Sequence, residues 1–359
     1  MAATDYPLNH PLAVKRWAQG LMKEALKRTF ALQFIGKSAE ALIQTKTELN
    51  KAEGDRIRFG IRQQLSGGGI QGDNTLEGNE EALETFSQDI VIDQLRHAVR
   101  SKGKMSEQRV PFTVRDEARD GLADWWADRL DAWMFNQLCG NTEQADVRYT
   151  GMQATIAPDA DHLVTMVSGN LEASISATTV HTFSLSIIDK AVEIAKTAKN
   201  TMRPIRVGSD DYWVQFIHPY QTTDLRTTTS TGQWLDIQKA ALSGGKISEN
   251  PIFTGALGVY NNVILKESVR IPRGTFGSQV TLGAVTGGGV YRSVLCGAQA
   301  ACLAFGRGYG QNTYSWVEEL FDFKNQLGVA AGCIGGLQKT RFNGSDFATV
   351  VCSTYAAKH

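Results

Sequence analysis

The residues of this sequence that could do chemistry lie first in a glycine-rich stretch. Gly67, Gly69 and Gly72 match the G-x-G-x-x-G spacing of a dinucleotide-binding turn, and they follow a predicted strand. A true fingerprint would open an apolar helix, whereas residues 73–81 are acidic and polar. The preceding strand also alternates apolar and charged residues, where a buried parallel strand would be continuously apolar. A nucleotide-binding enzyme therefore stays open only as the least favoured alternative.

Two further patterns imitate ligand sites. Gly36-Lys37-Ser38 ends like a phosphate-binding loop, but Ala31 stands where the first glycine belongs. The stretch from Asp73 to Glu84 places oxygen-bearing side chains at the ligand positions of a calcium-binding loop, but a strand precedes it where a helix is needed. A solvated acidic loop is the favoured interpretation, and an opportunistic divalent cation is the alternative. We predict no metal and no cofactor.

Catalytic constellations are missing from the sequence. It holds neither the G-x-S-x-G turn of a serine nucleophile nor the H-E-x-x-H of a zinc protease, and its six histidines are scattered. Asp93 and His97 could share one face of a helix, where a structural ion pair is the usual outcome. The cluster of Trp125, Trp126 and Trp133 could bind a ligand, but on an amphipathic helix it is more often core or subunit interface. We predict no catalytic residues and no enzyme.

The composition describes an ordinary folded protein without a strong overall field. Hydrophobic residues make up 42% and charged residues 21% of the 359 positions, a length that suits about two or three domains. Basic and acidic residues number 37 each, so no global charge attracts nucleic acid or membrane. The five cysteines form no zinc spacing, and most have small apolar neighbours, which indicates a reducing compartment. Without a signal peptide or a membrane-length apolar run, we expect a soluble protein made inside the cell.

The elements that must position these residues begin with an arm formed by the first 54 residues. Trp17, Leu21, Ala25 and Leu26 recur at helical spacing, and basic residues lie between them. Two interpretations stay open for this predicted helix. It either packs on its own chain as a surface helix, or it faces DNA or a partner as a basic arm.

Residues 55–112 are predicted to form one long excursion from the folded core. Residues 56–62 alternate apolar and basic side chains, as a half-buried strand does. Residues 65–81 hold five glycines with acids and amides, which is too polar a mixture to bury much surface. A return path follows through Ile90–Ile92 and Arg109–Phe112. A loop of this length within a compact domain usually means function or disorder.

The strongest helix signal runs from Val114 to Leu138. Thr113 and Asp116 have the spacing of a capping box, and Gly140 supplies a stop. The predicted buried stripe consists of Ala118, Leu122, Trp126, Leu130, Trp133 and Leu138. The aspartates expected mostly off this stripe are Asp120, Asp124, Asp128 and Asp131. Residues 141–183 show weak periodicity and are expected to be irregular.

The rest of the chain is predicted to mix helices and strands. A second helix begins at a capping box of Ser186 and Asp189 and buries Ile188, Ala191, Val192 and Ala195. We expect a short helix at 234–242 and strands near 212–219 and 258–264. Three C-terminal strands are predicted at Tyr314–Val317, Gly328–Leu337 and Phe347–Cys352. The pattern as a whole is α+β.

Several stretches, in order along most of the chain, are similar to one known family. They are Gly54–Ile57, Leu65–Asp73, Leu76–Glu81, Ile92–Val99, Ala118–Trp125, Asp131, His218–Arg226, Leu295–Ala300 and Lys339–Gly344. Through them the sequence resembles the major capsid proteins of tailed bacteriophages with the Hong Kong 97-type fold. Within that group it most resembles the coat-protein family named for the podophage N-four.

The resemblance implies an α+β Hong Kong 97-like capsid fold and a subunit that self-assembles into the icosahedral head shell around the phage genome. By analogy, the chain divides into an N-terminal arm at 1–54, an extended β-hairpin loop at 55–112, a peripheral domain at 113–183 with its spine helix at 113–140, an axial domain at 184–312, and return strands of the peripheral domain at 313–359. A bacterial nanocompartment shell protein of the same fold is the alternative. Nothing in the sequence assigns a crosslinking pair.

The resemblance also implies the partners. We expect hexamers and pentamers of this chain, contacts with decoration and portal proteins, and non-specific contact with packaged DNA, but no membrane. The protein would pass from the host cytoplasm into the virion capsid. The extended loop is expected to lie across a neighbouring subunit. The residues predicted to make these inter-subunit contacts are Arg56, Arg58, Arg62, Leu65, Ile70, Leu76, Glu80 and Glu81.

Overall fold

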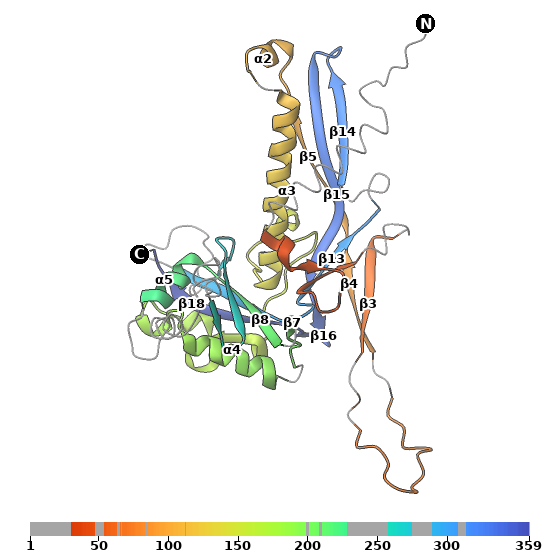
Figure 1. Ribbon diagram of the computed structural model, residues 1–359, viewed down its shortest axis with the longest axis vertical. Coiled ribbons are helices and arrows are strands. Elements are labelled where there is room, and N and C mark those ends of the chain that lie inside the picture. Colours follow the sequence, from red (N-terminus) through yellow and green to blue (C-terminus); the bar gives the residue numbers. More distant parts are fainter. Residues whose placement is uncertain are drawn as a thin grey trace.

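Two large β-sheets and one long helix organise the chain, as Figure 1 shows for the computed structural model. The structure describes residues 30–46, 54–62, 65, 67–82, 85–111, 113–198, 201–207, 210–227, 258–274, 289–307 and 314–358. The predicted N-terminal helix and the predicted short helix at 234–242 lie outside these residues. Within the described part of the chain, no helix is both long enough and apolar enough to span a membrane.

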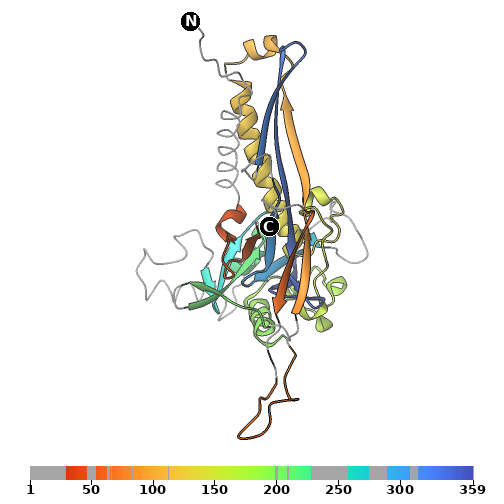
Figure 2. The ribbon, with the colours of Figure 1, turned by 90° about the vertical axis from the view of Figure 1, so that its right-hand side faces the viewer.

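The first sheet forms a tall column. It has six strands in the order β1-β2-β13-β15-β14, and β5 also pairs with β15. The strands span Ile35–Gly36 (β1), Ile43–Lys46 (β2), Asp93–Arg100 (β5), Ala301–Phe305 (β13), Tyr314–Phe321 (β14) and Gln326–Lys339 (β15). Figure 2 shows the β14–β15 hairpin and helix α3 side by side along the long axis. The long strand β15 therefore serves as the common partner that joins this sheet together.

Helix α3 (Val114–Leu138) has the predicted bounds and packs along this sheet. All six residues of the predicted apolar stripe are exposed by 4% or less. Trp126 meets the ring of Tyr314 on β14 edge-on, with the ring centroids 4.9 Å apart. Each buried side chain of this size contributes about 1.5–3 kcal/mol. Tertiary packing therefore stabilises a helix whose middle contains Gly121.

The two ends of α3 differ in how well the sequence predicted them. Thr113 is the N-cap residue, but its side chain makes no capping hydrogen bond. Its carbonyl instead accepts the N–H of Asp116 at 3.1 Å, so the predicted capping box is wrong. At the other end, Gly140 has a φ of 62°, a conformation that favours glycine, and supplies the predicted stop.

Asp131 also departs from its prediction, and it positions the start of the described chain. It is only 9% exposed, rather than off the buried stripe with the other aspartates. Its carboxylate accepts the N–H groups of Phe30 at 3.2 Å and Ala31 at 2.9 Å, at the beginning of the 3-10 turn η1 (Phe30–Phe34). Burial raises the pKa of Asp131 against the effect of these two hydrogen bonds. The N-terminal segment is thereby attached to the C-terminal half of α3.

The second sheet runs in the order β6-β18-β12-β8-β10-β9, with β11 paired to β12 and β7 paired to β8. Its strands span Leu163–Thr165 (β6), Ile205–Val207 (β7), Asp210–Ile217 (β8), Gly258–Tyr260 (β9), Val263–Glu267 (β10), Arg273–Gly274 (β11), Gly289–Cys296 (β12) and Thr349–Ala356 (β18). Helix α4 packs against this sheet in a second hydrophobic core. The first core also includes residues of β8 and β12, so the two sheets share apolar contacts.

Helix α4 (Leu185–Thr197) buries the predicted face, but it does not begin as predicted. The N-cap is Ser184 rather than Ser186, and it makes no side-chain capping bond. Asp189, the other half of the predicted capping box, accepts hydrogen bonds from the Tyr260 hydroxyl at 2.9 Å and the Asn261 amide at 3.0 Å. The predicted capping box is wrong here too, because this carboxylate binds a neighbouring turn.

The strands divide between the sheets differently from the domain boundary expected at residue 312. Strand β13 precedes that position and lies in the first sheet, whereas β18 follows it and pairs with β12 in the second. The segments on either side of residue 312 are therefore interleaved. Strand β13 is buried throughout and β18 at every residue but Tyr355, and this pattern fits any central strand without indicating which strand it pairs with. Helix α5 (Pro219–Thr227) and strand β12 were not predicted.

Candidate functional site

The glycine-rich excursion starts and ends in an antiparallel hairpin. Strand β3 (Arg56–Arg62) has its predicted bounds and pairs with β4 (Thr85–Val91). The alternation places Ile57 inward, opposite Ile90, and leaves the side chains of Arg56 and Arg58 exposed. Ile57, Ile90 and Ile92 pack against β13 in a small apolar cluster of their own. The base of the excursion is thus fixed to the core through one face.

Polar contacts attach the same base to the end of β15. The Gln88 side chain donates to the carbonyl of Lys339 at 2.8 Å and accepts the N–H of Arg341 at 2.8 Å. The Val91 carbonyl passes so close to β15 that a Cβ on Gly336 would lie 2.1 Å from it, so this position requires glycine. The sequence did not point to Gln88 or Gly336. The Gln88–Lys339 contact joins residues 251 apart, which no local pattern reveals.

An ion pair crosses the hairpin on its exposed face. Arg58 lies opposite Asp89 and binds it with two hydrogen bonds, from Nε to Oδ1 at 2.6 Å and from Nη2 to Oδ2 at 2.8 Å. These hydrogen bonds lower the pKa of Asp89. The Arg58 side chain is 70% exposed, so solvent screens the pair and its contribution to stability is small.

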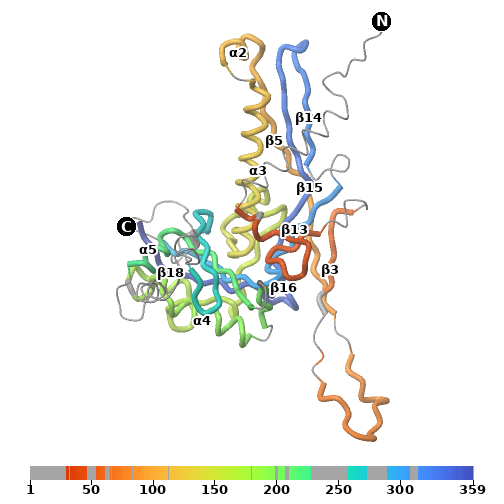
Figure 3. Tube along the Cα trace, in the orientation of Figure 1, coloured from red at the N-terminus to blue at the C-terminus, as the bar shows by residue number. Residues whose placement is uncertain are grey.

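Beyond the hairpin, residues 67–82 project away from both sheets, as Figure 3 shows, and all of them are exposed. The Gly67 N–H donates to the Glu81 carboxylate at 2.7 Å and so joins the two sides of the loop. The Gly78 N–H donates to Glu80 at 2.8 Å. Two of the predicted contact residues, Glu80 and Glu81, therefore also accept hydrogen bonds within the loop.

Three apolar side chains of the excursion face solvent. Leu65, Ile70 and Leu76 are 58%, 39% and 60% exposed. A loop that carries exposed apolar side chains is typical of a surface that a partner covers. The predicted contact residues lie in two groups, with Arg56 and Arg58 on the base, Arg62 at the end of β3, and Leu65, Ile70, Leu76, Glu80 and Glu81 on the excursion.

The geometry gives little support to the rival ligand sites. The N–H of Gly67 already donates a hydrogen bond to the Glu81 carboxylate, and the negative charge of this carboxylate would repel a phosphate at that position. In the Gly36-Lys37-Ser38 sequence, Gly36 ends strand β1 and a Cβ built on it would lie 2.8 Å from the Cβ of Ala41. Among the residues that the structure describes, no three acids, histidines or cysteines are grouped to hold a metal ion. Glu84, the last position of the calcium pattern, lies outside those residues.

Asp93 and His97 do not share a helix, so that prediction is wrong. Both lie on strand β5, where residues four apart are about 13 Å from each other. The His97 ring instead stacks on Trp125, with centroids 4.6 Å apart. Trp126 and Trp133 are 0% and 1% exposed and belong to the core, as the structural interpretation of this cluster predicted. The five cysteines are all buried free thiols.

A second exposed surface, which the sequence did not indicate, lies at the far end of the column. In the turn between β14 and β15, Asp322, Phe323 and Lys324 all have positive φ. Phe323 is 104% exposed at the tip. Met105 of helix α2 (Lys104–Gln108) is 67% exposed as well. The molecule thus presents apolar side chains to solvent at both ends of its long axis.

Comparison with known proteins identifies the relatives of this architecture. A family model described as "Phage capsid protein" matches residues 5–358. The major capsid protein of Pseudomonas phage KPP25 is 28% identical over 354 residues, covering 91% of this chain and 89% of the relative.

Solved structures agree with this match. The capsid of Ralstonia phage GP4 has a TM-score of 0.78 and 32% identity, and the alignment covers 99% of both chains. The Cyanophage Pam1 capsid asymmetric unit has a TM-score of 0.73 at 19% identity, covering 100% of this chain and 95% of the other. The second likeness supports the fold alone. With its column, spine helix, excursion and second sheet, the chain belongs to the phage capsid protein family and has the Hong Kong 97-type capsid fold.

Proposed function

We propose that this chain assembles into the phage head through its excursion, with each loop lying across a neighbouring subunit. The chain is a major capsid protein of the virion and a structural protein rather than an enzyme. Capsid assemblies of its relatives imply homo-oligomerisation into a shell. The further proposal concerns which residues make the contacts: Arg56, Arg58, Arg62, Leu65, Ile70, Leu76, Glu80 and Glu81.

One observation carries this proposal. The hairpin base is held by apolar and polar contacts to the first sheet, whereas the loop beyond it makes internal hydrogen bonds and exposes Leu65, Ile70 and Leu76. Because these side chains are 58%, 39% and 60% exposed, covering the rest of each in a neighbour would contribute about half of the roughly 1.5–3 kcal/mol that full burial gives. A rigid base with an apolar, solvated tip is the arrangement that a limb reaching a neighbour requires.

The finer assignments rest on the resemblance. We propose hexamers and pentamers, contacts with portal and decoration proteins, non-specific contact with packaged DNA, and membership of the podophage N-four-like coat proteins. The interleaved strands support a modified domain proposal. The first sheet with α3 would form the peripheral domain, and the second sheet with α4 the axial domain, so that of the arm expected at residues 1–54 only the part before β1 stays an arm.

The test replaces the three exposed apolar side chains without touching the base. The variant Leu65→Ser, Ile70→Ser, Leu76→Ser should stay soluble, keep its melting temperature and fail to form shells in negative-stain electron microscopy. A matched control, Asp73→Asn with Thr75→Ser in the same loop, should form shells normally. Normal shells from the triple variant would refute the role of this loop. A variant that deletes the excursion should keep strand β5, because β5 pairs with β15 in the first sheet.

A further inference from the structure

Helix α3 packs on one face of the column sheet, and the other face is turned to solvent. Tyr314 on β14 contacts Trp126 of α3, and His97 on β5 stacks on Trp125 of the same helix. Because side chains alternate along a strand, the neighbours of these residues lie on the opposite side of the sheet. We call that side the open face. It consists of Arg96, Ala98 and Arg100 on β5, Gly328, Ala330 and Gly332 on β15, and Ser315, Val317 and Glu319 on β14.

A shallow apolar strip crosses the middle of the open face. Ala98 lies opposite Ala330, and Ala330 lies opposite Val317 in the next strand. The Val317 side chain is 47% exposed, and Ala98 is exposed as well. Apolar residues in a row on an exposed sheet face are typical of a surface that a partner covers.

Glycines of β15 let two arginines lie along the edges of this strip. A Cβ on Gly332 would lie 2.8 Å from the Cγ of Arg96, so the Arg96 stem fills the space above that glycine. Gly328 is covered in the same way by the ring of Phe321. The Arg100 guanidinium lies over this ring, 4.3 Å from its centroid, and such a contact helps to hold a cation in place. The sheet therefore positions both arginines.

These two positive charges have no counter-ion within the described part of the chain. Arg96 and Arg100 are exposed, and the ion pairs among the described residues involve other bases. Glu319 shares the open face, but no ion pair joins it to either arginine. The open face thus offers two fixed cations on either side of an apolar strip.

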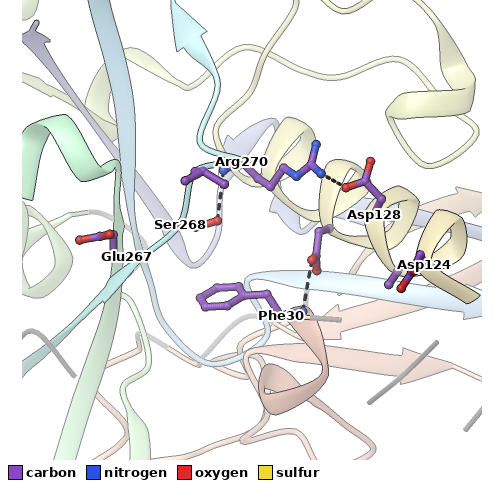
Figure 4. Close-up of a pocket in the computed structure, with 9 residues that line it drawn as sticks. Phe30, Asp124, Asp128, Glu267, Ser268 and Arg270 are labelled. Carbon is purple, nitrogen blue, oxygen red and sulfur yellow. Dashed lines mark hydrogen bonds and ion pairs between the residues drawn. The ribbon is translucent and has the colours of Figure 1, made fainter. Parts of the chain in front are cut away.

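Charged groups beside α3, in contrast, meet partners in their own chain. Figure 4 shows a pocket of about 510 Å³ that residues of α3 line together with Phe30 and the segment after β10. In its wall Arg270 pairs with Asp128, and the Asp131 carboxylate accepts the N–H of Phe30 at 3.2 Å. These contacts fasten segments of one chain together. The arginines of the open face serve no such internal contact.

The excursion carries the opposite charge. Residues 67–82 contain four acids and neither lysine nor arginine. The acids are Asp73, Glu77, Glu80 and Glu81. Glu77 and Glu80 flank a turn that the Asn79 N–H closes by donating to the Leu76 carbonyl at 3.0 Å. Two exposed carboxylates thus lie close in the chain to Leu76, whose side chain is 60% exposed. This combination complements an apolar strip between two arginines.

We propose that the open face receives the excursion of a neighbouring copy, with Leu76 on the apolar strip. Glu77 and Glu80 of the neighbour face Arg96 and Arg100. The inference rests on the proposed function, because it names the surface that the excursion covers. The excursion points away from the column of its own chain in Figures 1 and 2, so the contact joins two subunits. Opposite charges at such a contact fix its register and disfavour wrong pairings.

Packaged DNA is the other polyanion that two arginines could meet. Binding to a duplex draws on several phosphate contacts at once, whereas this face offers two bases and the acid Glu319. The strip from Ala98 to Val317 also gives a phosphate backbone nothing to bind. A protein loop with a few acids and an apolar side chain fits the open face better.

A charge exchange tests the pairing. Arg96→Glu with Arg100→Glu should lower the yield of shells in negative-stain electron microscopy at least about tenfold, because acids then meet acids. Glu77→Arg with Glu80→Arg should do the same. The four substitutions together should restore the yield, which also shows that the chain still folds. The control, Arg96→Lys with Arg100→Lys, keeps both charges and should form shells.

Zero-length crosslinking tests which surfaces meet. In shells of the control variant, a carbodiimide should join the new lysines to Glu77 or Glu80 of another chain, as covalent dimers on a denaturing gel and peptide mass spectrometry would show. The unassembled chain should not give this crosslink. Val99→Lys places the amine one residue from Arg100 but on the side of the sheet that faces α3, and it should not crosslink to these acids.

The outcomes separate this inference from the proposed function. Normal shells from the arginine reversal, together with none from the triple serine variant, would place the receiving surface elsewhere and leave the proposed function standing. Normal shells from the triple serine variant would refute the proposed function itself. The pairing is overturned if the fourfold variant stays defective or if no crosslink between chains forms. Arginine-reversal shells of normal yield that package little DNA would assign the open face to DNA.

Discussion

Replacing Arg292 by methionine tests how the two sheets are joined. Arg292 on β12 binds the Glu172 carboxylate with two hydrogen bonds, from Nε at 2.8 Å and from Nη2 at 2.7 Å. Its third nitrogen, Nη1, donates to the carbonyl of Gly140 at 2.8 Å, just after the end of α3. The Ser353 hydroxyl on β18 also donates to Glu172. One guanidinium therefore connects the spine helix, an irregular segment and the second sheet.

The expected cost follows from burial. The side chains of Arg292 and Glu172 are only 10% and 16% exposed. Removing one partner of such a pair leaves the other as an uncompensated buried charge, which costs about 3–5 kcal/mol. We therefore expect Arg292→Met to lower the free energy of unfolding by about that amount at pH 7. The double variant Arg292→Met, Glu172→Gln should recover a large part of it, because no charge stays buried.

The cost should depend on pH in a defined direction. Burial by itself raises the pKa of Glu172, but the hydrogen bonds and charge of Arg292, with the Ser353 hydroxyl, outweigh it and hold the pKa below its ordinary 4.5. A carboxyl with a depressed pKa stabilises the fold above its unfolded pKa, and this stability is lost as pH falls through the folded pKa. In Arg292→Met burial acts without the arginine, so the pKa of Glu172 should rise above 4.5. Its carboxyl then becomes neutral at low pH, and the difference between variant and wild type should shrink.

The assay is urea unfolding of the unassembled chain, followed by tryptophan fluorescence at pH 7 and at pH 4. Arg58→Met is the matched control, because its pair with Asp89 is exposed and its removal should leave the unfolding free energy nearly unchanged. The reasoning is refuted if Arg292→Met is as stable as wild type at pH 7. It is also refuted if the loss of stability is the same at both pH values.

Two further predictions concern buried thiols and a strained turn. Because burial raises the pKa of Cys139 and of Cys352 to about 12, a thiol reagent at pH 8 should label them in urea but not in the native protein, and rapid native labelling would contradict this. Gly140→Ala combines a positive φ with a Cβ placed 2.8 Å from the Ile156 carbonyl, so it should cost about 1–3 kcal/mol and lower the melting temperature. Gly68→Ala, which meets nothing within 4 Å, is its control, and equal melting of the two variants would contradict the strain.

The resemblance and the local pattern together predicted the kind of protein and many of its elements. Strand β3 and helix α3 have their predicted bounds, because the repeat of two residues that marks a strand and the repeat of 3.6 that marks a helix can both be read from neighbouring positions. The capping boxes at Thr113 and Ser186 failed for a different reason. Their spacing offers a hydrogen bond to the helix end, but another partner can take the side chain, as Tyr260 and Asn261 take Asp189.

The sequence by itself determined which residues can be buried together on one face, where the glycine-rich excursion lies, and that this excursion is too polar to fold alone. Only the tertiary structure decided which distant segments meet. Strand β5 joins β15 rather than the excursion, and β18 crosses to the second sheet, because backbone hydrogen bonds pair any two strands of suitable shape. Asp131 is buried because the N–H groups of Phe30 and Ala31, about 100 residues away, satisfy its carboxylate. A charged side chain can be buried only where such a partner is present, and the residues next to it in the sequence do not reveal which partner that will be.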